Sequence, residues 1–193
     1  MKRSEVKTNK KGDYAEKIVM ENLHSKDINT FKNSIDVPHP FDFLLYKKRN
    51  GIWELNPADV KAKPKMSKYN ATGIDQKDYQ TYLDIQDRYN MNVYLFFVDE
   101  EMGKVYGNYL NELEKEVIDG EQKYPFTLKD KYGIEIRIFH MDNMITQFRL
   151  TPEHREDLIE LTDQKYIKPH IYTEAEKIKR LQELKNLRNE GKA

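Results

Sequence analysis

The sequence has 193 residues, enough for one domain or for one domain with an appendage. Hydrophobic residues make up 38% of it, and thirteen tyrosines and eight phenylalanines supply the apolar mass of a core. Because the formal net charge is zero, any affinity for nucleic acid has to come from local basic patches. The absence of cysteine excludes disulfides, thiolate metal sites and cysteine nucleophiles.

No apolar stretch approaches the ~20 residues of a membrane span, and the first residues lack the apolar centre of a signal peptide. We therefore expect a soluble, cytoplasmic protein without a membrane partner. No glycine-rich loop matches a nucleotide-binding fingerprint, so no nucleotide cofactor is expected. The histidines lack the His-x-x-x-His spacing of zinc proteases, and no Gly-x-Ser-x-Gly elbow is present.

The chain begins with a basic segment, residues 1–11, whose small number of apolar side chains predicts a flexible arm. A helix is then expected from Gly12 to about His24, with its apolar side chains on one arc at about 100° per residue. Glu16 falls inside this arc. A carboxylate that faces a core requires a partner, so Glu16 either reaches solvent at the helix edge or binds a cation.

Two strands joined by a tight turn are predicted from Phe41 to Lys63. Asp42 lies in the first strand, and Asn50-Gly51 supplies the turn, because this dipeptide tolerates positive φ. The second strand ends in Asp59-Val60-Lys61. Since side chains alternate across a strand, Asp59 and Lys61 share one face, and the hairpin can bring Asp42 beside them.

Pro57 lies within the second strand and predicts a bulge or bend, because proline cannot donate to a strand ladder. The remaining elements expected in chain order are an irregular or short-strand entry at 28–40, a basic loop at 63–72, a helix at 75–89, strands at 92–98 and 104–107, a helix at 109–117, a strand at 134–140 and a helix from Thr151 to about 164. The apolar run at 92–98 is typical of a strand covered on both faces.

This order predicts an α/β or α+β fold with a mixed central sheet flanked by helices. We expect a core over residues 12–120 and a C-terminal α+β extension, including a helix, packed on it over residues 121–193. The last helix, 173–189, carries an apolar stripe that would dock either on the body of the protein or on a second copy. A homodimer is therefore one of two expectations for this segment.

Acid-x-Lys tripeptides are common in this sequence, and context distinguishes Asp59-Val60-Lys61. It ends a strand, its hairpin partner carries Asp42, and a helix with Gln76 and Gln80 follows. With Glu16 in the first helix, this order resembles the PD-(D/E)xK nuclease superfamily and its restriction-endonuclease-like fold. The resemblance covers about residues 12–110 and departs from the family pattern at Phe41, which separates the preceding proline from Asp42.

The resemblance implies hydrolysis of DNA phosphodiester bonds with Mg²⁺ or Mn²⁺, as in endonucleases of the repair, recombination, restriction or phage type. Glu16, Asp42 and Asp59, together with the Val60 carbonyl, would hold the metal, because hard oxygen ligands suit these ions. Lys61 would orient the attacking water or neutralise the developing charge. Gln76 or Gln80 would orient Lys61 or contact the phosphate.

Other interpretations of the same residues remain open. Asp59 and Lys61 also fit a surface ion pair, and Asp42 fits a turn cap. The nearby lysines either track phosphates or form a solvated surface; they are Lys47, Lys48, Lys63, Lys65 and Lys68. The alternative to a nuclease is a module on the same fold that binds nucleic acid or protein without cleaving it, and an RNA nuclease would share the chemistry.

Overall fold

The computed structural model describes residues 7–32, 39–49 and 51–162. Its helices are α1 (Lys7–His24), α2 (Gln76–Tyr89), α3 (Leu110–Leu113) and α4 (Pro152–Leu161), with a 3₁₀ turn, η2, at Met141–Asn143. Its strands are β1 (Asn29–Lys32), β2 (Phe43–Arg49), β3 (Ile52–Lys61), β4 (Ala71–Asp75), β5 (Tyr94–Asp99), β6 (Lys104–Tyr109), β7 (Val117–Asp119), β8 (Gln122–Tyr124), β9 (Phe126–Lys129), β10 (Glu135–His140) and β11 (Ile145–Arg149). Within these ranges, none of the helices is both long and apolar enough to cross a membrane.

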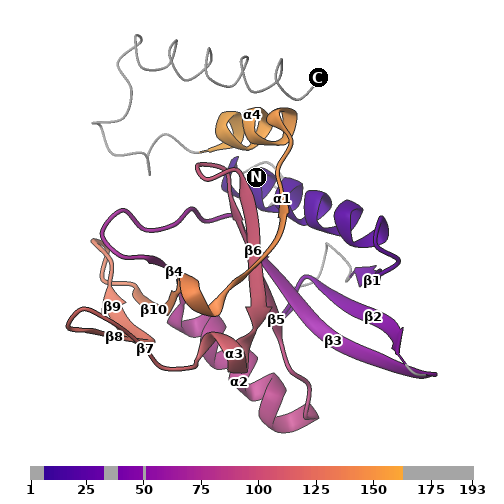
Figure 1. The fold of residues 1–193 in the computed structure, drawn as a ribbon, viewed down its shortest axis with the longest axis horizontal. Helices are drawn as coiled ribbons and strands as arrows, with labels where there is room; N and C mark the ends of the chain where they lie inside the picture. The colour runs from indigo at the N-terminus through magenta and orange to yellow at the C-terminus, as the bar shows by residue number, and fades with distance from the viewer. Residues whose placement is uncertain (1–6, 33–38, 50, 163–193) are drawn as a thin grey trace.

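The central sheet has six strands in the order β1-β2-β3-β5-β6-β11. Strands β3 and β5 are parallel, and the other neighbours are antiparallel, so the sheet is mixed. Helix α1 packs on one face of this sheet and helix α2 on the other (Figure 1). We call these the α1 face and the α2 face. The predicted mixed sheet flanked by helices is confirmed.

Alternation along the strands divides the core into two layers. On the α1 face, Val60 and Phe96 pack with apolar side chains of α1, including Ile18. On the α2 face, Leu95 and Phe97 pack with those of α2 and α3. Strand β5 is therefore buried from both sides, as its unbroken apolar sequence predicts.

A second sheet, β4-β10-β9, and the hairpin β7–β8 lie beside α2 (Figure 1). Gly73 in β4 allows a close approach to β10, since a Cβ atom there would lie 2.6 Å from the Arg137 main-chain oxygen. Residues beyond 120 are thus built into both sheets, because β10 pairs with β4 and β11 pairs with β6.

Several expected elements differ from the structure. Helix α1 already begins at Lys7, so a flexible arm is wrong for residues 7–11. The Lys11 ammonium is buried and lies 2.7 Å from the Glu100 carboxylate at the end of β5. Residues 1–6 and the expected helix at 173–189, with its docking stripe, lie outside the described residues.

The bulge expected at Pro57 is also wrong, because the register of β2 with β3 runs without a shift from Phe43–Ala58 to Arg49–Ile52. The Ala58 main-chain oxygen accepts from Asp42 N, so the polar groups of Ala58 face β2 and the nitrogen of Pro57 faces the other way. The pairing of β3 with β5 begins only at Ala58, so the missing N–H of Pro57 interrupts neither ladder.

The segment expected as one helix at 109–117 is a single helical turn, α3, followed by strand β7. Gly120 adopts φ +61° in the turn between β7 and β8. Strands β4, β7, β8, β9 and β11 were not expected. By contrast, α4 begins as predicted, with Thr151 as its N-cap and proline at the first helical position.

Candidate functional site

The residues singled out in the hairpin meet where β3 ends. Asp59 and Lys61 alternate with the core residue Val60 and therefore lie on the α2 face. Asp42 lies directly before β2 rather than inside it, and its main-chain N–H donates to Ala58 O at 3.0 Å. Two carboxylates and one ammonium are thereby brought to one end of the central sheet.

The Asp42 side chain continues the β2–β3 ladder by one bond, since its Oδ2 accepts a hydrogen bond of 2.7 Å from Val60 N. The Val60 carbonyl lies on the same side of β3, because both main-chain polar groups of a strand residue point the same way. Burial, then the neighbouring Asp59 and Glu16 carboxylates, raise the pKa of Asp42 to about 8. The charged form of Asp42 is thus disfavoured in the metal-free protein, because burial and two like charges outweigh the Val60 N–H and Lys61.

Asp59 is the most buried acid of the group, with 8% of its side chain exposed. Its Oδ2 lies 2.9 Å from Lys61 Nζ, yet this oxygen accepts no hydrogen bond of regular geometry. A buried carboxylate oxygen with a free lone pair is costly for the protein alone and is suited to a cation.

Lys61 contacts a second carboxylate that the sequence did not single out. Its Nζ donates to Asp78 Oδ2 at 2.8 Å, from the first turn of α2, and lies 5.9 Å from the centre of the Tyr82 ring. Burial alone lowers the pKa of Lys61, but Asp59 and Asp78 outweigh it and raise that pKa above its usual value. Lys61 is therefore a fixed positive charge at neutral pH.

Glu16 projects from α1 and is close enough to influence Asp42 electrostatically. Its own carboxylate is paired with Lys32 of β1 at 2.8 Å. In the part of the chain that the structure describes, no three Asp, Glu or His side chains are grouped as a ready metal site. The structure therefore brings Asp42 and Asp59 together but does not join Glu16 to them as a third ligand.

The two glutamines of α2 do not reach Lys61 in this structure. Gln76 Oε1 accepts from the Thr127 hydroxyl at 3.4 Å, and Gln80 is exposed. Asp78, between them, occupies the position next to Lys61. The sequence did not single out Asp78 as a partner of Lys61, because an acid in the first turn of a helix is common for reasons of helix stability alone.

The candidate basic residues fall into two groups, three just after β3 at this end of the sheet and two in β2 near the turn of the hairpin. Lys63 pairs with Asp75 at 3.1 Å, Lys65 contacts Asn70 at 3.2 Å, and Lys68 lies over the Tyr69 ring. Lys47 and Lys48 are neighbours in β2 and so point to opposite faces. Of these two, Lys48 shares the α2 face with Asp59. It lies opposite Trp53 in the strand register, and Trp53 and Asp59 are an even number of residues apart on β3.

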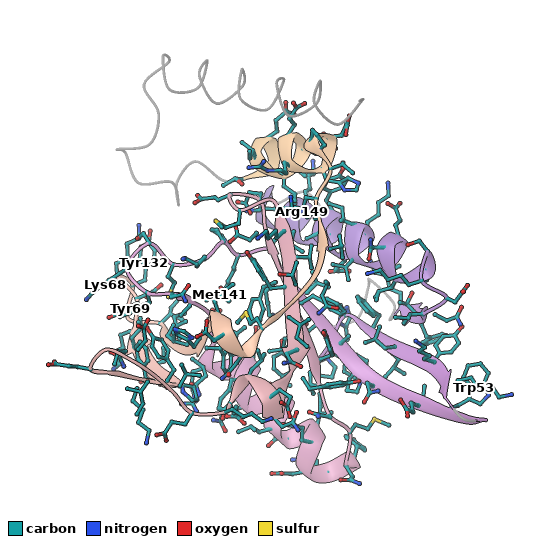
Figure 2. The ribbon with its side chains drawn as sticks, in the orientation of Figure 1. Trp53, Lys68, Tyr69, Tyr132, Met141 and Arg149 are labelled. Carbon is teal, nitrogen blue, oxygen red and sulfur yellow. The ribbon has the colours of Figure 1, made fainter. Side chains whose placement is uncertain are left out.

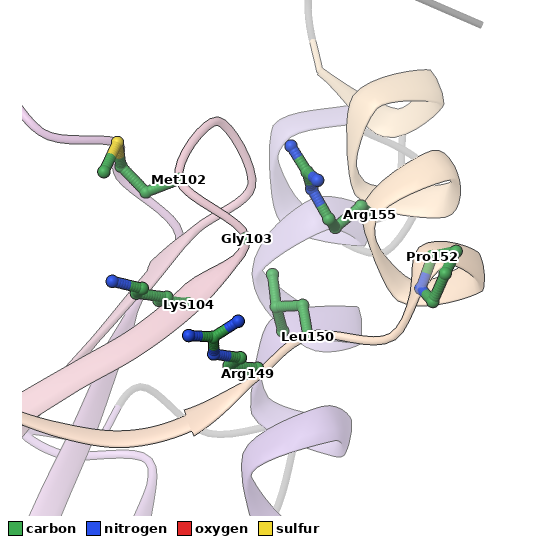
Figure 3. A pocket seen from close by; sticks show the side chains of 7 residues that line it. All are labelled: Met102, Gly103, Lys104, Arg149, Leu150, Pro152 and Arg155. Atoms are coloured by element: carbon green, nitrogen blue, oxygen red, sulfur yellow. The ribbon is translucent and has the colours of Figure 1, made fainter. Parts of the chain in front are cut away.

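A pocket of about 170 Å³ at the same end of the sheet carries further positive charge (Figure 3). Lys104 and Arg149 line it from the paired strands β6 and β11. In the register of β5 with β6, Lys104 lies opposite Asp99, which points to the same face as Phe97 two residues earlier. Arg149 lies opposite Lys104 in the register of β6 with β11, so both cations share the α2 face. Neither is in an ion pair with any described acid, whereas Arg155 donates to the main-chain oxygens of Glu100 and Glu101.

No family model and no curated protein matches the sequence. Among solved structures, the chain is similar to Hjc, a Holliday junction resolvase from the archaeal hyperthermophile Archaeoglobus fulgidus, with 12% identity over 65% of this chain and 88% of that chain and a TM-score of 0.41. It is also similar to D212, a nuclease from a fusselovirus, with 13% identity over 76% of this chain and 87% of that chain and a TM-score of 0.38. Hjc is described as a Holliday junction resolvase and D212 as a nuclease, and the resemblance of this chain to PD-(D/E)xK nucleases stays a prediction.

Proposed function

We propose that this chain is a metal-dependent nuclease that hydrolyses phosphodiester bonds in DNA at the end of β3. The observation that carries the proposal is the Asp59 carboxylate, buried beside Asp42, with an oxygen that accepts no regular hydrogen bond and an ammonium 2.9 Å away. Such an arrangement stores negative charge where a cation can neutralise it and where a phosphate can meet Lys61.

Asp42 and Asp59, with the Val60 carbonyl, would hold Mg²⁺ or Mn²⁺. Two carboxylates are sufficient, because Mg²⁺ usually keeps several waters and takes one or two protein carboxylates. When bound, the ion supplies a water of lowered pKa and offsets charge on the phosphate in the transition state. Glu16 would act through a water, since its carboxylate already pairs with Lys32.

Lys61 would bind a non-bridging phosphate oxygen and stabilise the charge that develops there. Its raised pKa favours this role over proton abstraction, because the side chain stays protonated at neutral pH. Asp78 would be a positioning residue that holds the ammonium at the end of β3 through its contact of 2.8 Å.

The DNA backbone would extend from this site across the basic residues at the same end of the sheet. Lys63, Lys65 and Lys68 follow β3 directly in the sequence. Lys104 and Arg149 lie on the same sheet face, free of ion pairs with described acids. Phosphate contacts of this kind position a strand without reading its sequence.

A module that binds without cleaving is the second candidate, and one observation favours it. Lys61 already bridges two carboxylates, at 2.9 and 2.8 Å, and such a network can stabilise the end of β3 without any chemistry. The two candidates differ in whether the Asp59 carboxylate serves a metal or only Lys61.

The test is nicking of supercoiled plasmid DNA in Mg²⁺, Mn²⁺ or EDTA. The nuclease predicts nicking that requires the metal and is lost in Asp59→Asn and Lys61→Met, while Asp84→Asn, an exposed acid on α2, cuts like the wild type. DNA binding without cleavage in either metal would support the second candidate. Competition with unlabelled RNA distinguishes a ribonuclease.

A further inference from the structure

The hairpin β2–β3 carries an exposed row of apolar side chains on the α2 face, the face of Asp59. Counting back from Asp59 by twos leads to Leu55 and Trp53, and the register places Tyr46 opposite Leu55. Strand β1 adds Phe31, which pairs with Leu44 on that face. We call Phe31, Tyr46, Trp53 and Leu55 the aromatic strip.

Helix α2 does not cover this strip, because the core beneath α2 is built on β5 and not on β1 or β2. Phe31 is 64% exposed, Trp53 56% and Leu55 48%. Figure 2 shows Trp53 near the outer end of the hairpin, on the opposite side of the view from Tyr69 and Tyr132. The described part of the chain thus leaves an apolar surface open on the same face as the proposed catalytic residues.

The chemistry of the strip points to nucleobases. The Tyr46 and Trp53 rings lie 5.9 Å apart with planes tilted by 55°, and the Lys48 ammonium lies 5.9 Å from the centre of the Trp53 ring. No acid shares this face of β2 or of β3 between Trp53 and Pro57. Aromatic rings beside cations are typical of surfaces that bind single-stranded nucleic acid. Lysine is depleted in the cores of protein interfaces, so the presence of Lys48 favours nucleic acid over a protein partner.

We propose that the aromatic strip binds unpaired bases of a nucleic-acid strand whose backbone leads to Asp59 and Lys61. Trp53 and Asp59 are six residues apart along β3, about 20 Å, so several nucleotides would separate them. The inference rests on the proposed function in that it defines the substrate of that same site: a nucleic acid with a single-stranded segment next to the cleaved bond.

The direct test uses Trp53, the one tryptophan of the chain, as the reporter. The full-length protein is titrated with a single-stranded oligothymidine of 20 nucleotides and with a 20-base-pair duplex, in EDTA and in Ca²⁺. Stacking on Trp53 predicts saturable quenching of its fluorescence by the single strand and little by the duplex. Unchanged fluorescence where the anisotropy of a labelled oligothymidine is saturated would overturn the inference, as would no binding in either buffer.

Variants identify the surface that binds. Trp53→Ala is expected to weaken binding of labelled oligothymidine by between about fivefold and about a hundredfold, the range for loss of one stacked base. Trp53→Phe should recover most of the affinity. Tyr132→Ala is the matched control, because Tyr132 is also exposed beneath a lysine, Lys131, but lies away from the strip. Equal losses in Trp53→Ala and Tyr132→Ala would contradict the assignment.

The remaining outcomes separate this inference from other possibilities. A protein that binds the single strand through Trp53 in EDTA but never cuts DNA in Mg²⁺ or Mn²⁺ would retain the strip and refute the nuclease. A sedimenting mass that doubles with concentration in the wild type and not in Trp53→Ala would overturn the inference, because the strip would then be a surface between two copies of the chain.

Discussion

The Lys61 ammonium lies 2.9 Å from the carboxylate of Asp59, two residues before it on the same face of β3. This contact compensates a buried carboxylate, one oxygen of which accepts no hydrogen bond of regular geometry. The same ammonium reaches Asp78 at the start of α2 and so ties the end of the strand to the helix that covers it. Stability and proposed chemistry therefore depend on one side chain.

Lys61→Met is expected to lower the free energy of unfolding by about 1–3 kcal/mol in EDTA, because the Asp59 carboxylate is left buried without its cation. Mg²⁺ should restore part of this loss, as a bound ion would neutralise the same carboxylate. Urea unfolding with and without Mg²⁺ measures both effects. Lys63→Met, which breaks a more exposed ion pair, is the control; the same loss in both variants, or no recovery with Mg²⁺, would contradict the proposed role of Asp59.

The stability of the metal-free protein should depend on pH through Asp42. The folded-state pKa of about 8 lies above the usual carboxyl value, so the folded state binds the extra proton. The stabilisation is complete below about pH 4 and is lost as pH rises towards about 8, with a slope of at most about 1.4 kcal/mol per pH unit. Urea unfolding in EDTA at pH 5.5 and 8 should show a larger decrease for the wild type than for Asp42→Asn, and equal decreases would refute this.

Asp59→Asn and Asp78→Asn should differ in cleavage rate although both acids contact Lys61. Loss of a metal ligand is expected to lower the rate by about 100-fold or more, in line with removal of other charge-stabilising groups in active sites. Asp78→Asn keeps a hydrogen-bond acceptor beside Lys61 and should lose less than about tenfold. Single-turnover cleavage of a labelled DNA measures this directly, and similar losses in both variants would favour the purely structural network.

Lys104→Ala and Arg149→Ala should each reduce the salt dependence of DNA binding. Loss of one phosphate contact lowers the slope of log K against log salt concentration by about 1. Anisotropy titrations from 50 to 200 mM KCl provide the slope. Lys17→Ala removes an exposed lysine on α1 and should leave the slope unchanged. An unaltered slope in the two pocket variants would exclude Lys104 and Arg149 from the DNA path.

The sequence predicted those features that depend on local pattern. The Asn-Gly turn and the acid-x-lysine at the end of β3 identified the hairpin, because turn chemistry and alternation act over a few residues. The apolar run at 92–98 identified β5 for the same reason. The capping threonine and the proline of α4 were also sufficient to locate its start.

Long-range pairing determined the features that the sequence did not predict. Strand β4 is short, follows a polar, basic loop, and pairs with β10, more than sixty residues later. Lys11 reads as part of an exposed basic arm and is buried only because Glu100 approaches it from the end of β5. In the same way, the Lys32 partner of Glu16 and the Asp78 partner of Lys61 arise from the packing of separate elements.

The most direct test of a metal site at Asp42 and Asp59 is Mn²⁺ binding to the metal-free protein, measured through the electron paramagnetic resonance signal of the free ion. A metal site at Asp42 and Asp59 predicts saturable binding by the wild type, loss of that binding in the double variant Asp42→Asn/Asp59→Asn, and full retention in the control Asp75→Asn/Asp84→Asn. Equal Mn²⁺ binding by the two double variants would show that Asp42 and Asp59 do not hold the ion.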